Sequence, residues 1–277
     1  LDDVRKLSDR GVPVVHRKTG YRGRGIAELR AEVDGVIEGD RRQIELSPYI
    51  THSVFQSEYS RDVFRSSGFA GRFSVIPNGV DTSIFNTIRV RRFRGSRPRE
   101  WWRPTDPVRL VVSTWSTDPS KGWSEVSRVA ERLRDRRDAT LTVVGRVPSG
   151  CELPATRTLG PRRAEELAEI LKRAHVILNL TQWESCSNAL IEGLNCGLPA
   201  IYLDSGANRE VAGEYGVAYE GDIVEALDEI RRRYADIVAR LPENPYRIEP
   251  VAARYLAVLA SVAAGDELDV PDVAKPA

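Results

Sequence analysis

From Val108 onward, short apolar runs alternate with longer amphipathic ones, and this alternation constrains the fold more than any other feature. VRLVVST (108–114) and ATLTVVG (139–145) have the length and β-branched content of buried strands. Between them, WSEVSRVAERLRDRR (123–137) places its apolar residues on one helical face. Strands that alternate with helices predict a parallel sheet, so we expect an α/β fold with a complete Rossmann-like C-terminal domain over residues 108–264.

The alternation continues to residue 204, and helices are expected after residue 227. The further elements that we expect in this domain are strands at 156–160, 175–181 and 198–204 and helices at 162–174 and 187–197, the last ending at Gly197. The preceding part has fewer elements: strands at 12–17, 50–57 and 73–81 and a helix at 58–67. We therefore expect a partial N-terminal domain at 1–88, a linker at 89–107 and a flexible tail at 265–277.

The charge balance and the cysteine content exclude several function classes. Lys and Arg number 41 against 40 Asp and Glu, so the net charge of +1 supplies no field for nucleic acid or an anionic membrane. No apolar run reaches the roughly 20 residues of a membrane helix, and no signal peptide is recognisable. The three cysteines form no disulfide or metal pattern, so we expect a cytoplasmic protein with reduced thiols. The chain begins at Leu1 without any methionine, which indicates either a cut or processed chain or methionines lost from the sequence.

The most informative stretch runs from the predicted strand at 175–181 through a polar loop into the next helix. The first helical turn is expected directly after Glu184. Four amides then lack helical partners and favour a phosphate: those of Ser185, Cys186, Ser187 and Asn188. Glu192 lies about two turns farther on, roughly 12 Å away at the usual helical rise, so the two glutamates do not form an acid–base pair. The spacing suits an elongated ligand with hydroxyls at both ends.

Loops after neighbouring strands should open on the same sheet edge. Lys121 follows the first strand of the domain, where it would offset the charge of a diphosphate near Glu184. Gly145 and Arg146 end the next strand on the same edge. SGANREVAG (205–213) supplies a tight turn at its glycine and free amides at another helix start, so Gly206, Ala207 and Asn208 join the candidate ligand-binding residues.

Each candidate also has a simpler interpretation. Glu184 and Glu192 could be an acidic residue at a helix start and a solvated helix position. Lys121 could be an ordinary surface lysine, Gly145 an ordinary turn glycine, and Glu210 a capping residue only.

The histidines and the absent motifs narrow the chemistry further. His16 ends a predicted N-terminal strand, where it could act as a base or bind an acceptor, although a lone histidine is more often structural. His52 and His175 fall within apolar strands and are expected to be structural. The sequence has no G-x-S-x-G elbow, no phosphate-loop motif and no metal-ligand cluster, so hydrolase, kinase and metalloenzyme functions lose their main support.

Four stretches, in this order along the chain, resemble one enzyme family. SVIPNGVDTSIF (74–85) resembles its Ile-Pro-Asn-Gly-Val-Asp segment, and SKG (120–122) its Lys-Gly loop. ESCSNALIEGLNCGLPAIYLD (184–204) resembles its block of two glutamates followed by Gly-x-Pro, and SGANREVAG its Gly-Gly-x-x-Glu loop. The chain is thus similar to the retaining GT-B glycosyltransferases of family four, also called glycosyl transferases group 1.

The resemblance implies transfer of a sugar from a nucleotide diphosphate donor to an acceptor hydroxyl, with retained anomeric configuration and no essential metal or cofactor. It implies that Glu184 contacts the hydroxyls of the donor sugar and Glu192 the ribose. The amides after Glu184 and the side chain of Lys121 would bind the diphosphate, and His16 completes the candidate catalytic set. The acceptor would be a glycan, a lipid-linked molecule or a small-molecule hydroxyl.

The chain also departs from the family pattern. Ser116 stands where the family usually has an arginine, and Arg146 is the candidate replacement at this part of the donor site. A glycine-rich loop and further strands that normally precede the strand at 12–17 are missing, so we expect a truncated N-terminal domain.

These departures leave other functions open. The main alternative is a non-catalytic module that binds a nucleotide or a partner. Nucleic-acid binding through the arginines at 89–103 is not expected, because charge is balanced elsewhere. The same arginines with Trp101 and Trp102 offer a peripheral contact to an anionic lipid-linked acceptor, although a solvated linker is the preferred interpretation.

Overall fold

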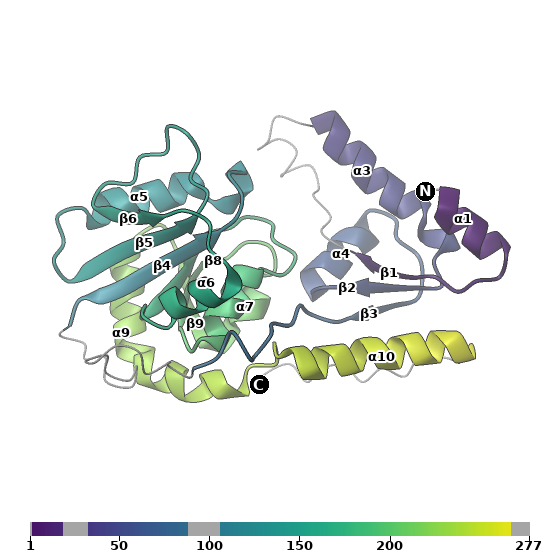
Figure 1. Cartoon of the computed structure of the whole chain (residues 1–277). Helices are drawn as coiled ribbons and strands as arrows, with labels where there is room; N and C mark the ends of the chain where they lie inside the picture. The colour runs from purple at the N-terminus through teal and green to yellow at the C-terminus, as the bar shows by residue number, and fades with distance from the viewer. Residues whose placement is uncertain (1, 19–32, 88–105, 267–277) are drawn as a thin grey trace.

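The computed structural model describes residues 2–18, 33–87 and 106–266 and contains two parallel sheets (Figure 1). The N-terminal sheet has the strand order β1-β2-β3 and the C-terminal sheet the order β6-β5-β4-β7-β8-β9. Every neighbouring strand pair is parallel. The α/β fold class expected from the sequence is therefore confirmed.

The elements of the N-terminal part are α1 (Asp2–Asp9), β1 (Val15–Lys18), α3 (Val33–Glu45), β2 (His52–Phe55), α4 (Glu58–Ser66) and β3 (Phe73–Val75). The C-terminal part contains β4 (Val108–Thr114), α5 (Trp123–Leu133), β5 (Ala139–Gly145), β6 (Thr156–Leu159), α6 (Ala164–Leu171), β7 (Val176–Asn179), α7 (Asn188–Asn195), β8 (Ala200–Leu203), α8 (Asn208–Ala212), β9 (Gly216–Tyr219), α9 (Ile223–Arg240) and α10 (Ile248–Ala264). The predicted strands at 108–114 and 139–145 match β4 and β5, whereas β9 was not predicted. Most of the predicted linker and tail lies outside the described residues.

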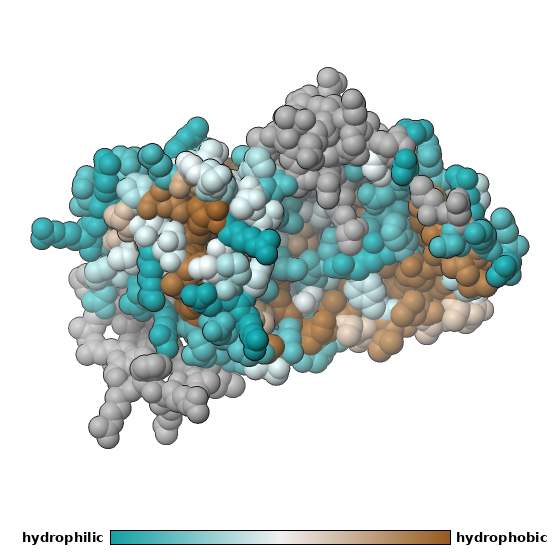
Figure 2. All heavy atoms as spheres, turned by 45° about the horizontal axis from the view of Figure 1, so that its top comes forward, coloured by the Kyte–Doolittle hydropathy of each residue, from teal (hydrophilic) through white to brown (hydrophobic). Residues whose placement is uncertain are grey.

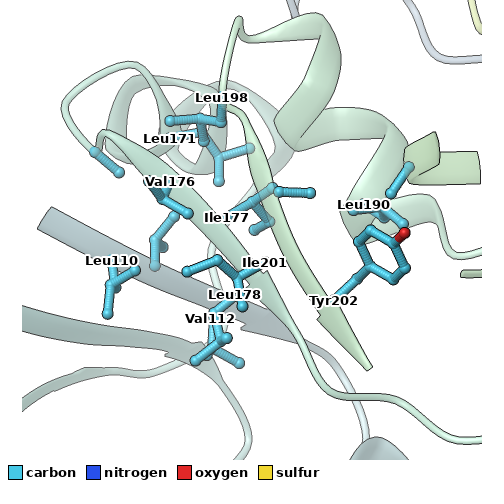
Figure 3. Packing of buried hydrophobic residues seen from close by; sticks show 14 of the residues in the cluster. Leu110, Val112, Leu171, Val176, Ile177, Leu178, Leu190, Leu198, Ile201 and Tyr202 are labelled. Carbon is cyan, nitrogen blue, oxygen red and sulfur yellow. The ribbon is translucent and has the colours of Figure 1, made fainter. Parts of the chain in front are cut away.

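The core of the C-terminal sheet explains why its strands are almost continuously apolar. Helices cover both faces of β4 and β7, so side chains that point to either face are buried. Figure 3 shows Leu110, Ile177 and Ile201 from three neighbouring strands packed together with helix residues. Gly193 of α7 lies so close to the sheet that a Cβ atom there would come 2.9 Å from Ile177. This close approach fixes α7 on the sheet.

Helix α10 packs on the N-terminal sheet and not on the domain that precedes it (Figure 1). Val251 and Val258 join Val54 and Ile76 in one buried cluster. The guanidinium of Arg254 also donates a hydrogen bond of 2.6 Å to a carbonyl of β3. Helix α10 thus lies within the limits expected for the C-terminal domain, 108–264, but its apolar face is covered by the other sheet.

On the face shown in Figure 2, hydrophilic residues predominate, and hydrophobic residues gather toward the lower right and in a second area in the left half. On α10, Leu256 and Leu259 are among the exposed apolar side chains. Within the described ranges, none of the helices is both long enough and apolar enough to cross a bilayer.

Candidate active site

Loops from four neighbouring strands meet at the carboxyl edge of the C-terminal sheet. Arg146 follows β5, Lys121 lies in the turn after β4, Glu184 follows β7 and Gly206 follows β8. The strand order reverses between β4 and β7, since the chain builds β4, β5 and β6 outward in one direction and β7, β8 and β9 in the other. Ligands of open parallel sheets bind at such a reversal. The site therefore has its centre between Lys121 and Glu184.

The structure brings Lys121 and Glu184 into direct contact. The Nζ atom of Lys121 lies 2.5 Å from Oε2 of Glu184, although the two residues are 63 positions apart in the sequence. Each side chain is 26% exposed, so the pair is partly desolvated yet open to a ligand. A ligand that carries both phosphates and hydroxyls can replace this mutual contact, because the phosphates suit the cation and the hydroxyls suit the carboxylate.

Lys121 is fixed by the backbone around it. Gly122 has a φ of +75°, and a Cβ atom there would come 2.0 Å from the carbonyl oxygen of Leu180. The carbonyl of Ser120 accepts a hydrogen bond of 2.7 Å from the amide of Gln182. The turn after β4 thus lies directly on the segment that leads to Glu184, and only glycine at 122 permits this approach.

A second turn, formed by residues 205–207, holds the backbone of Glu184. The amide of Trp183 donates to Oγ of Ser205 at 3.0 Å, and the amide of Ala207 donates to the carbonyl of Glu184 at 2.8 Å. A Cβ atom on Gly206 would come 2.5 Å from the nitrogen and the oxygen of Glu184. We call residues 205–207 the clamping turn.

This geometry corrects the prediction that amides around Ala207 and Asn208 face a ligand. The amide of Ala207 is bonded to Glu184, and the amide of Asn208 donates to Ser205 at 3.3 Å. The Asn208 side chain is 1% exposed and donates to the carbonyl of Thr181 at 2.8 Å. The N–H groups of Ala207 and Asn208 therefore bond to protein acceptors and not to a ligand. These bonds stabilise the loop that carries Glu184.

The predicted helix at 187–197 matches α7, whereas the expectation that its first turn directly follows Glu184 is wrong. Helix α7 begins at Asn188, and Ser187 is its N-cap, with Oγ accepting from the amide of Leu190. Ser185 and Cys186 form a buried bend before it, because a serine at 187 is a better cap than a residue nearer the strand. Among the described residues, none accepts a hydrogen bond from the backbone amides of 185–188. The four predicted donors, which lie in a turn and a helix start, therefore have no acceptor within the described protein, and we call them the open amides.

Glu192 lies on the second turn of α7, where burial raises the pKa of its carboxyl to about 7. In the part of the chain that the structure describes, no side chain donates a hydrogen bond to this carboxylate. A largely buried acceptor without a protein donor suits the hydroxyls of a ligand.

The raised pKa of Glu192 predicts a pH-dependent cost to stability. The folded protein binds this proton up to about pH 7 and the unfolded chain only up to about 4.5, so stability falls as the pH rises through that window. Glu192→Gln should therefore raise the free energy of unfolding by roughly 1–3 kcal/mol at pH 8. At pH 5 the gain should be much smaller. Urea unfolding of both proteins at the two pH values checks this, and an equal gain at both would contradict it.

The other predicted donor-site residues lie after β4 and β5 at the same edge of the sheet. Gly145 has a φ of +126° at the end of β5, directly against Thr114, and the exposed Arg146 follows it. Oγ of Ser116 accepts from the amide of Asp118 at 3.1 Å, so this side chain supports the turn that carries Lys121.

His16 lies in the middle of β1, on the opposite sheet face from Arg17. Burial, assisted by the nearby charge of Lys18, lowers the pKa of its imidazole to about 4, so His16 is neutral at pH 7. Its buried Nδ1 has no hydrogen-bond partner among the described residues. No described contact joins His16 to Lys121 or Glu184.

Sequence reasoning missed Asn78, which connects the two sheets at the site. Its Nδ2 donates to the carbonyl of Cys186 at 3.0 Å and to Oδ1 of Asn188 at 2.7 Å. Its own Oδ1 accepts from Gln56 at 2.5 Å and from Arg17. Asn78 lies in the Pro-Asn-Gly turn after β3 and in the stretch 74–85 that resembles a family motif, but neither signal indicated its partners.

The described ranges contain no group of three or more His, Cys, Asp and Glu side chains arranged to hold a metal ion. All three cysteines are free thiols, and Cys186 and Cys196 are buried. Lys121, Arg146, the two glutamates and the open amides are groups at this sheet edge that can meet a ligand.

Comparison with known proteins agrees with this arrangement. Residues 106–236 match the family model of glycosyl transferases group 1, and no curated protein sequence matches the chain. The fold is similar to sucrose-phosphate synthase from Thermosynechococcus elongatus, with 16% identity, a TM-score of 0.67, and coverage of 91% of this chain and 68% of that one. It is also similar to HepE from Anabaena, crystallised with UDP-glucose, at 15% identity, a TM-score of 0.69 and coverage of 94% and 75%.

A third similar structure is trehalose 6-phosphate synthase from Burkholderia multivorans, with 12% identity, a TM-score of 0.62 and coverage of 95% and 70%. At these identities the likeness establishes the fold, with two parallel sheets whose carboxyl edges flank the site. The family match covers the six-stranded sheet, with Lys121 and both glutamates inside its limits. The chain therefore has the fold of GT-B glycosyltransferases, and its residues 106–236 match glycosyl transferases group 1.

Proposed function

We propose that the protein is a retaining glycosyltransferase of family four, which moves a sugar from a nucleotide diphosphate donor to an acceptor hydroxyl. The observation that carries the proposal is the Lys121–Glu184 ion pair at the reversal of strand order, beside the open amides of 185–188. A lysine and peptide N–H groups suit a diphosphate, and a carboxylate suits sugar hydroxyls. HepE, which has a similar fold, was crystallised with a donor of this class.

In the proposed reaction, the bond between the anomeric carbon and the diphosphate oxygen breaks while the acceptor oxygen bonds to the same face of that carbon. The acceptor proton passes to the departing diphosphate oxygen. Negative charge grows on the diphosphate, and Lys121 and the open amides stabilise it. Lys121 leaves Glu184 for the diphosphate, so Glu184 becomes available to the sugar hydroxyls and Glu192 to the ribose.

The same charges support a reaction without an essential metal ion, because Lys121 and the amides offer positive charge where it is needed. Glycans, lipid-linked molecules and small-molecule alcohols are all candidate acceptors. We further propose a cytoplasmic location, where thiols such as Cys186 stay reduced.

The proposal is tested by thermal unfolding with a panel of nucleotides and nucleotide sugars, with and without EDTA, followed by product analysis on a broad acceptor panel. At least one nucleoside diphosphate should raise the melting temperature, and EDTA should leave that shift unchanged. The corresponding nucleotide sugar should then give a transferred sugar with retained configuration. Nucleotide binding without turnover would instead favour a non-catalytic module, and strict metal dependence would contradict the proposed class.

A further inference from the structure

One carboxylate of the C-terminal domain is bound by a helix of the N-terminal domain. Glu210, in the first turn of α8, accepts hydrogen bonds from the backbone amides of Glu58 at 2.8 Å and Tyr59 at 3.2 Å. These are the first two residues of α4, and 152 and 151 positions separate them from Glu210. The contact therefore exists only while the two domains lie in their present arrangement.

The amides that Glu210 binds are those that α4 cannot satisfy by itself. The N-cap of α4 is Ser57, and its hydroxyl accepts from the amide of Ser60. The amides of Glu58 and Tyr59 have no helical acceptor, as in any first turn. A carboxylate that accepts both at a helix N-terminus gains from charge-assisted hydrogen bonds and from the helix dipole. Glu210 thus completes the capping of a helix that belongs to the other domain.

Glu210 lies close in sequence to the residues that position Glu184. The clamping turn at 205–207 bonds the backbone of Trp183 and Glu184, and Glu210 is three residues farther along the same segment. The hydroxyl of Tyr246 donates to the carbonyl of Val211 at 3.2 Å, which ties the segment to the crossing into α10. A shift of α4 away from Glu210 would therefore act on the short segment that positions Glu184.

We propose that Glu210 is a positioning residue of the transfer reaction: its contact with the first turn of α4 holds the two domains in their present arrangement and keeps the clamping turn on Glu184. The inference rests on the proposed function. It assigns to Glu210 no contact with substrate. Loss of the contact should let the two domains move relative to each other and thereby lower kcat. Nucleotide binding to the C-terminal domain should be largely retained.

The first test compares Glu210→Ala with the wild-type protein. We expect kcat to fall about tenfold and the donor KM to change by less than about twofold, since a charge-assisted contact is lost far from the donor. The distribution of distances between fluorophores on α4 and α9 should shift to longer values or broaden in the variant. This measurement does not require a known sugar acceptor. An unchanged kcat in an active enzyme, or an unchanged distance distribution, would overturn the inference.

The second test removes a donor from the other side of the contact. Proline is tolerated at the first helical position, and Ser57 before it is already extended, so Glu58→Pro deletes one amide without breaking α4. Glu58→Ala is the matched control, because it removes the ion pair of Glu58 with Arg61 and keeps the amide. Glu58→Pro should lower kcat more than Glu58→Ala does.

A double-mutant cycle completes the design. In the Glu210→Ala background, Glu58→Pro should lower kcat no more than Glu58→Ala does, because the contact with the amide of residue 58 is already lost. If the two substitutions lowered kcat independently, so that their effects multiplied, the proposed contact between Glu210 and α4 would be refuted. A wild-type protein that transfers no sugar would count against the proposed function alone, and the distance measurement would still decide whether Glu210 holds the domains.

Discussion

Glu184→Gln is expected to lower kcat of sugar transfer by about a hundredfold while leaving the fold intact, because glutamine has the same size and lacks the charge. In the ligand-free protein the carboxylate balances Lys121 at 2.5 Å, and in the proposed reaction it holds the sugar hydroxyls. Glu45→Gln is the control, since Glu45 forms an exposed ion pair with Arg41 on α3 at 2.6 Å. That variant should transfer sugar at the wild-type rate.

The same substitution should have the opposite effect on binding of a nucleoside diphosphate. Without its carboxylate partner, Lys121 keeps its full charge for the diphosphate, so the affinity should stay equal or rise. Lys121→Ala should instead weaken diphosphate binding by about tenfold or more. Calorimetric titration of both variants separates the two roles, and a parallel loss of affinity would contradict the assignment of Lys121 to the phosphates.

Of the proposed substitutions, Gly145→Ala is expected to lower the free energy of unfolding most, by about 3 kcal/mol or more. Its φ of +126° is unfavourable for any residue with a Cβ atom, and that atom would come 1.5 Å from the carbonyl oxygen of Thr114. The clash is with backbone in the central strand pair β4–β5, so the strands would have to separate.

Gly150→Ala is the matched control for this prediction. Gly150 has a φ of +79°, but nothing lies within 4 Å of the position of an added Cβ atom. Its replacement should cost only about 1 kcal/mol, from backbone conformation alone. Urea unfolding of the two variants measures the difference, and equal losses would show that close packing at Gly145 contributes little.

The elements that the sequence predicts best are those determined by local pattern. Strands β4 and β5 are rich in apolar and β-branched residues and end at turn residues, and the predicted limits match the observed ones. Strand β9 was missed because GVAY begins with glycine and has a single β-branched residue, a composition that does not favour a strand. The helix predicted at 187–197 lies close to α7, but its first turn was also assigned to the residues directly after Glu184, because an acidic residue is common at a helix start.

Long-range contacts account for what local pattern did not reveal at the site. The sequence order of strands and loops sufficed to place Lys121 and Glu184 at one sheet edge. Asn78 and Glu210 both lie in stretches that resemble family motifs, but their roles depend on partners more than 100 residues away, which no local pattern identifies. The clamping turn was interpreted as a ligand-binding loop because free amides and occupied amides look alike in a sequence.

The location of α10 affects how the polypeptide can fold as it is synthesised. The apolar face of the N-terminal sheet, with Val54 and Ile76, is covered by residues of a helix that leaves the ribosome about 200 positions later. The six-stranded sheet between them has its own core and needs no such delayed partner. The half of the molecule that is translated first is therefore the half that is completed last, and until then its exposed apolar face is open to chaperones or to misassociation.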